Sequence, residues 1–122
     1  MQAAADTLKP VTLELGGKSP VVVFADADMR NAVNGALNAN FMCQGEVCSN
    51  GTRVLVENSI KDEFVGLLCE AAQRIRIGDP LQDRTTFGAL ISAQHRDKVL
   101  GYIDTAIKEG CKTALDRSRV TD

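Results

Sequence analysis

The sequence is poor in aromatic residues and close to neutral in charge. It contains no Trp, one Tyr and four Phe among 122 residues, and its formal net charge is −2. So few rings offer little for base stacking, and a slightly acidic chain has no attraction for a phosphate backbone. We therefore expect no nucleic-acid partner and a core built mostly from aliphatic side chains.

A long apolar run is also missing. The longest strongly apolar stretch, residues 21–25, is far too short to cross a bilayer. The first residues do not show a basic segment followed by an apolar one, which is the pattern of a signal peptide. We expect no membrane partner and a cytoplasmic location, with an organellar one left open.

Metal-binding cysteine pairs are absent as well. The cysteines are Cys43, Cys48, Cys69 and Cys111, none in a Cys-x-x-Cys pair, and the only histidine is His95. We therefore expect no metal site and reduced thiols. Cys43, Cys69 and Cys111 are interpreted as packing residues, and His95 as a surface histidine without a partner nearby in the sequence.

What is present is an alternation of β-prone and helical segments. Gly, Pro, Asp and Asn separate these segments. Asp26 or Asp28 is positioned to cap the first helix, and Asn58 or Ser59 the second. We expect β-prone segments over residues 11–15, 21–24, 52–56 and 111–115, and helices over residues 29–41, 60–75 and 93–108.

This order predicts an α/β fold with a parallel sheet covered by helices. The run over residues 21–24 is continuously apolar, as in a strand buried on both faces. Three or four strands and three helices are too few to cover such strands. We therefore expect an incomplete sheet, in a chain that is part of something larger or that associates to cover itself. Residues 116–122 are polar and are expected to form a disordered tail.

Two short motifs carry the chemistry. Cys48 is followed by the small, turn-prone residues 49–52, which can expose its sulfur as a nucleophile; the alternative is a buried structural cysteine. Glu14 precedes Gly16 and Gly17 and can act as a base; the alternative is a solvated carboxylate at a strand end. Residues 16–19 lack the spacing of a phosphate-binding loop.

The two motifs together resemble the signatures of the NAD(P)-dependent aldehyde dehydrogenase superfamily. Residues 13–20 (Leu-Glu-Leu-Gly-Gly-Lys-Ser-Pro) resemble its glutamate signature, and residues 44–54 its cysteine signature. Cys48 follows Glu14 by 34 positions, as the family spacing requires. The Asn-Gly-Thr-Arg-Val sequence of residues 50–54 is most similar to the betaine aldehyde and 4-trimethylaminobutyraldehyde dehydrogenase branch. The likeness covers residues 9–112.

The resemblance implies an enzyme that oxidises an aldehyde to a carboxylic acid with NAD, NADP being left open. Cys48 would attack the aldehyde and form a thiohemiacetal and then a thioester, while its backbone N–H helps to stabilise the oxyanion. Glu14 would activate the hydrolytic water. Leu15 and Gly16 would lie near the nicotinamide. The resemblance further implies a homo-oligomer for the full-length parent.

Some features depart from the family pattern. Glu46 stands where glutamine is common, and Ala89 replaces a usual proline. We interpret residues 1–115 as part of the catalytic domain and residues 116–122 as divergent. Without the upstream cofactor domain, the chain alone is expected to turn over little. Two alternatives remain: a truncated product that associates with full-length subunits, and residual esterase activity through Cys48.

Overall fold

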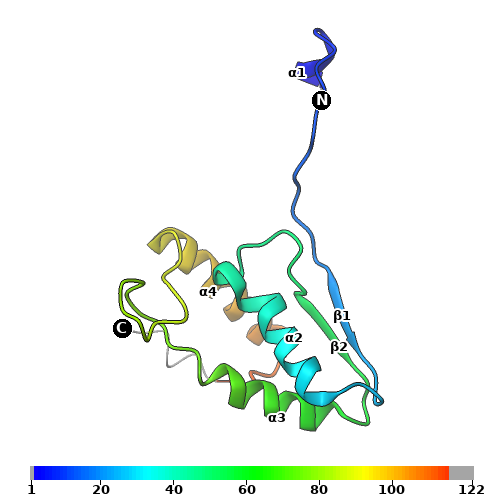
Figure 1. Cartoon of the computed structure of the whole chain (residues 1–122), viewed down its shortest axis with the longest axis vertical. Helices are drawn as coiled ribbons and strands as arrows, with labels where there is room; N and C mark the ends of the chain where they lie inside the picture. Colours follow the sequence, from blue (N-terminus) through cyan, green and yellow to red (C-terminus); the bar gives the residue numbers. More distant parts are fainter. Residues whose placement is uncertain (1, 116–122) are drawn as a thin grey trace.

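The computed structural model describes residues 2–115 and has an α/β architecture. Figure 1 shows two adjacent strands with α2 lying along them and α3 beside α2, while α4 lies behind α2 in this view. The elements are, in chain order, α1 (Gln2–Ala5), β1 (Pro20–Val23), α2 (Met29–Phe41), the 3₁₀ helix η1 (Met42–Gly45), β2 (Arg53–Val56), α3 (Lys61–Ala72) and α4 (Ala93–Lys108).

The sheet is parallel, as predicted. β1 and β2 pair from Pro20 opposite Arg53 to Val23 opposite Val56. A parallel pair needs a crossover between its strands, and α2 with η1 provides it. The predicted α/β class with a partial parallel sheet is thus confirmed.

The core lies where β1, α2 and α3 meet. Val23 of β1, Val33 and Ala36 of α2, and Phe64 of α3 are each at most 4% exposed. Val33 and Ala36 are three residues apart and therefore share one helix face. Within residues 2–115, nine partly buried hydrophobic residues from the same elements and their flanks pack against these four.

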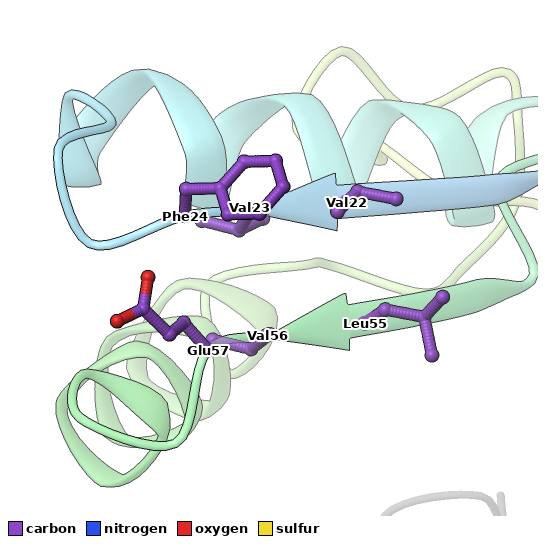
Figure 2. Close-up of a pocket in the computed structure, with 6 residues that line it drawn as sticks. All are labelled: Val22, Val23, Phe24, Leu55, Val56 and Glu57. Atoms are coloured by element: carbon purple, nitrogen blue, oxygen red, sulfur yellow. The ribbon is translucent and has the colours of Figure 1, made fainter.

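The first strand is covered on one face only, as expected for an apolar strand in an incomplete sheet. Val22 and Leu55 point to the face of the sheet away from the core and are 53% and 56% exposed. Phe24, just after β1, is 63% exposed. With Glu57, these residues line a shallow hollow at the carboxyl ends of the strands (Figure 2). In residues 2–115, helices cover only one face of the sheet, so alternate side chains stay in solvent.

Two of the β-prone segments do not form strands. Residues 11–15 run as an extended arm from the body toward α1 (Figure 1), and residues 111–113 are irregular, with bends at 114 and 115. Intrinsic β preference is insufficient, because a strand requires a neighbour for its backbone hydrogen bonds.

The helices over residues 29–41 and 93–108 match their predicted ranges, whereas α3 starts one residue later and ends three residues earlier than predicted, at Ala72. Asp28 caps α2 by accepting from the Asn31 N–H at 2.8 Å, so of the two candidates it is the cap. α3 begins after Ile60 without a side-chain cap, which corrects the expectation of Asn58 or Ser59. The Ser59 hydroxyl instead donates to Glu57 at 3.0 Å.

α4 spans its predicted range but is loosely packed. It contains no buried residue, and Val99, Ile103 and Ile107 of its apolar stripe are 37%, 37% and 45% exposed. The predicted tail, residues 116–122, lies outside the described residues. Within residues 2–115, no helix is both long and apolar enough to cross a membrane, and no three His, Cys, Asp or Glu side chains gather as metal ligands.

Candidate active site

Cys48 lies on an exposed turn between η1 and β2. The Asn50 N–H donates to the Val47 carbonyl at 3.2 Å and closes the turn over Cys48 and Ser49. The Gly51 N–H donates to the carbonyl of Ala39 in α2 at 2.9 Å. This hydrogen bond attaches the turn to α2 at Gly51, three residues after the cysteine. Cys48 itself is exposed to solvent.

Gly51 allows this attachment because a side chain does not fit there. A Cβ at Gly51 would lie 2.3 Å from Cγ2 of Val21 and 3.1 Å from Cβ of Ala39. Both distances are shorter than the normal separation of about 3.5–4.0 Å between carbon atoms. The close approach of turn, helix and β1 thus depends on glycine at this position.

The glycine-rich segment meets the cysteine turn. A Cβ at Gly17 would lie 3.1 Å from the Cys48 carbonyl oxygen, so the two backbones pass close to one another. The Arg53 N–H also donates to the Ser19 carbonyl at 3.4 Å. Parallel pairing of Pro20 with Arg53 explains the meeting, because the residues that precede both strands emerge at the same edge of the sheet.

The side chains proposed for the chemistry are less close than the backbones. Glu14 is exposed, three residues before Gly17, at the base of the extended arm. Among residues 2–115, no hydrogen bond joins the Glu14 carboxylate to the Cys48 thiol. The structure brings the two motifs together without bringing their reactive groups into contact.

The residues expected near a cofactor lie on the same exposed segment. Leu15 is 72% exposed, and no atom lies within 4 Å of a Cβ placed on Gly16. The backbone of Gly16 is therefore open to the approach of a flat group. Lys18, beside it, donates to the Gly17 carbonyl at 3.1 Å.

The other cysteines are not all packing residues, contrary to expectation. Cys43 and Cys111 are exposed, and only Cys69 in α3 is half-buried. The Cys69 thiol lies 3.6 Å from the Ala114 carbonyl, as a weak donor. The helical spacing that suggested packing for Cys43 ends at Phe41, because Cys43 already lies in η1 with a left-handed φ of 50°.

His95 has a partner that sequence reasoning missed. Its Nε2 lies 3.4 Å from Oε1 of Glu46, and the two side chains are 36% and 41% exposed. The residues are 49 positions apart, so local sequence cannot reveal the pair. The available signal was Glu46 itself, a carboxylate two residues before Cys48.

Asn50, two residues after Cys48, is buried at 5% exposure. Its Nδ2 has no hydrogen-bond partner among the described residues. A buried donor without an acceptor is unfavourable by about 1–3 kcal/mol. The turn is therefore close-packed at Gly51 and carries an unsatisfied polar group beside it.

The molecule is thus an α/β chain with an exposed cysteine turn beside a glycine-rich segment, at one edge of a parallel sheet. The model of the aldehyde dehydrogenase family matches residues 1–122, and the chain belongs to this family. The family membership predicted from the two motifs is confirmed.

Relatives with known names agree with this assignment. The chain is 54% identical over 112 residues to 4-trimethylaminobutyraldehyde dehydrogenase of Bos taurus, covering 92% of this chain and 23% of the relative. It is also 54% identical over 112 residues to 4-trimethylaminobutyraldehyde dehydrogenase B of Danio rerio, with coverage of 92% and 22%. The chain therefore spans about a quarter of the length of these relatives.

Solved structures share the fold. Betaine aldehyde dehydrogenase from Staphylococcus aureus, in complex with NAD+, superposes with a TM-score of 0.85 at 42% identity, covering 93% of this chain and 23% of that one. The NAD+ complex of aldehyde dehydrogenase from Bacillus cereus gives a TM-score of 0.85 at 37% identity, with the same coverage. The site described above is thus one part of a larger family fold.

Proposed function

We propose that this chain supplies the nucleophile and the base of an NAD-dependent aldehyde dehydrogenase, which oxidises an aldehyde to a carboxylic acid. The observation that carries the proposal is the close approach of Gly17 to the Cys48 carbonyl, which brings the two motifs together at one edge of the sheet. Family membership supports the reaction class.

Cys48 is the proposed nucleophile. Its sulfur is exposed on a turn whose ends are held by Val47 and Gly51, so an aldehyde carbon has access to it. The thiolate adds to the carbonyl carbon and forms a thiohemiacetal. Loss of hydride from that carbon leaves a thioester. The Cys48 N–H is proposed to donate to the oxyanion during both steps.

Glu14 is the proposed base for thioester hydrolysis. The reaction needs a proton removed from water, and an exposed carboxylate at the edge of the site can accept it. Glu14 and Cys48 make no direct hydrogen bond, which favours action on an intervening water over action on the thiol.

Leu15 and Gly16 are proposed to lie against the nicotinamide. The open space over Gly16 and the exposure of Leu15 suit a flat, partly apolar ring. NAD, when bound, accepts the hydride. The NAD+ complexes of the Staphylococcus aureus and Bacillus cereus enzymes support this cofactor, with NADP kept as a variant.

The substrate is proposed to be a small aldehyde. The names of the relatives, 4-trimethylaminobutyraldehyde and betaine aldehyde dehydrogenases, favour an aldehyde of that kind. The parent enzyme is proposed to be a cytoplasmic homo-oligomer, on the strength of the family resemblance alone.

A chimera tests the proposal. Bovine 4-trimethylaminobutyraldehyde dehydrogenase would receive the homologous 112 residues of this chain in place of its own segment, a replacement favoured by 54% identity. We expect the chimera to form NADH from its aldehyde. Cys48→Ser should reduce the rate at least ~10³-fold, a loss typical of removing a covalent nucleophile. Cys43→Ser is the matched control, because Cys43 is also exposed and lies five residues earlier.

Glu14→Gln isolates the hydrolytic step in the same chimera. The amide keeps the size of the side chain but cannot take a proton, so we expect a rapid first turnover followed by slow release of acid. Equal steady-state rates for Glu14→Gln and the parent chimera, or an active Cys48→Ser variant, would refute the assigned roles. The isolated 122-residue chain, assayed with an activated ester, gives a second comparison of the same variants.

A second candidate function is association with complete subunits of such an enzyme. The exposed side chains of Val22 and Leu55, on the sheet face away from the core, and of Phe24 just after β1 favour it. Soluble monomers rarely expose such a group of neighbouring apolar side chains to water. Co-purification with the bovine subunit, lost in Val22→Lys, is the expected result. A monomeric chain that ignores the subunit would eliminate this candidate.

A further inference from the structure

The segment before Cys48 has an unusual backbone. Cys43 and Gln44 have φ values of 50° and 56°, and Gly45 follows at 77°. Left-handed conformations are unfavourable for residues other than glycine. Two such residues in succession persist only where the surroundings hold them.

Three contacts from residues 87–95 hold this segment. The rings of Phe41 and Phe87 meet edge to face with centroids 6.4 Å apart. A Cβ on Gly88 would lie 3.1 Å from Nε2 of Gln44, so that amide packs on the glycine. The third contact is the pair formed by Glu46 and His95 at 3.4 Å.

The third contact lies nearest to the cysteine. Glu46 is two residues before Cys48, and its N–H donates to the Cys43 carbonyl at 3.0 Å. His95 is placed by the start of α4, where its N–H donates to the Ser92 side chain at 3.1 Å. Because α4 contains no buried residue, a polar contact at its first turn is an important attachment to the cysteine segment.

Few charged side chains lie near His95 in the sequence or in the described ion pairs. Glu46 faces it from the segment before Cys48. Residues 85–94 carry no charged side chain. On α4, Arg96 and Asp97 pair with each other at 2.7 Å, and Lys98 lies one turn along. Among the ion pairs of the described residues, Glu46 is therefore the anionic partner of the His95 imidazole.

We propose that His95 is a positioning residue for Cys48: its protonated imidazole holds Glu46 and thereby fixes the strained segment that presents the thiol. The proposal rests on the proposed role of Cys48 as nucleophile. Charge–charge attraction requires both a protonated imidazole and an ionised carboxylate, so the hold depends on the charge of the two side chains.

The single histidine makes the test specific. Amide chemical shifts of residues 46–49 in the 15N-labelled 122-residue chain would be followed from about pH 5 to about pH 8, the range in which histidine changes charge. We expect one transition shared by these amides and the His95 ring. Glu46→Gln and His95→Gln should remove the transition from the amides. Glu63→Gln, the same change at an exposed position in the first turn of α3, should retain it.

The rate of Cys48 alkylation by iodoacetamide, mapped by mass spectrometry, gives the functional readout. Partly exposed ion pairs have small effects, so we expect a change of about twofold to fivefold across the His95 transition, beyond the ionisation of the thiol itself. The change should be absent in both pair variants. A contact that only stabilised the fold would leave the shape of this pH profile unaltered.

The wild-type titration decides the matter even if a variant fails to fold. Constant amide shifts at residues 46–49, or a transition that survives Glu46→Gln, would overturn the proposal. If the amides titrate but Cys48→Ser leaves the chimera active, only the role of Cys48 fails. If Cys48 is essential but the amides do not titrate, only the role of His95 fails.

Discussion

Gly51→Ala is the substitution whose effect the structure defines most clearly. The new methyl group would lie 2.3 Å from Cγ2 of Val21 and 3.1 Å from Cβ of Ala39. Val21 belongs to β1, whose position is set by pairing with Val54, and its branched side chain has few rotamers to choose from. The strand, the helix or the turn must therefore move.

The magnitude follows from this overlap. Inserting a methyl group into a filled site typically costs about 1–3 kcal/mol. The contact with Val21 is more than ~1 Å shorter than a normal carbon–carbon separation of about 3.5 Å. We therefore expect a loss near the upper end, about 2–3 kcal/mol in the free energy of unfolding, measured by urea denaturation followed by circular dichroism.

Gly35→Ala is the matched control. Gly35 lies in the interior of α2, and no atom lies within 4 Å of the position that a Cβ would take there. Alanine favours a helix over glycine by about 0.5–1 kcal/mol, so this variant should be more stable than the wild type. The two glycine-to-alanine changes thus have opposite expected signs.

A double mutant identifies the cause. Val21→Ala removes the clashing Cγ2, so Gly51→Ala should cost at least ~1 kcal/mol less in that background, within the range of about 0.5–3 kcal/mol seen for residues in contact. A Gly51→Ala variant as stable as the wild type would refute the reasoning. So would an equal loss in both backgrounds, since the contact with Val21 would then not be responsible.

Three further predictions concern single elements and use the same denaturation assay. Phe64→Ala should cost about 3–5 kcal/mol, because this ring is 1% exposed at the meeting of β1, α2 and α3, and a loss below about 1 kcal/mol would contradict the observed core. Asp28→Ala should cost about 1 kcal/mol through the lost cap of α2, whereas Asp28→Asn should be nearly neutral; equal losses would exclude the cap as the cause. Glu57→Ala should cost about 1 kcal/mol, because the Glu57 carboxylate accepts from the Ala25 N–H at 2.8 Å and from the Ser59 hydroxyl. Glu57→Gln should retain part of this stability, and a neutral Glu57→Ala would show that the two hydrogen bonds add nothing to it.

The helices were predictable because their signals are local. The range of residues 29–41 followed from apolar spacing between Asp28 and Gly45, and residues 93–108 from spacing that ends before Gly110. Side-chain periodicity and capping depend on neighbours within one or two turns. The start of α3 was missed because Asn58 and Ser59 were expected to cap it, whereas Ser59 bonds to Glu57.

Strands were less predictable because they require partners. Residues 11–15 have a β-prone sequence but no neighbouring strand among residues 2–115, and they form an arm. Residues 20–23 and 53–56 pair as parallel strands, because α2 carries the chain back to the end of the sheet where β1 begins. Hydrophobic runs thus predicted where strands could form, and spatial neighbours decided which did form.

By itself, the sequence determined the family and the identity of its two characteristic motifs, because those depend on residue types and spacing. The positions of Glu14 and Cys48 can be read without any coordinates. Only the tertiary structure decided that Gly17 lies close to the Cys48 carbonyl and that Gly51 must be glycine. The pairing of Glu46 with His95 likewise needed the fold, since it joins residues 49 positions apart. Contacts of this kind arise from the path of the whole chain, which no local pattern encodes.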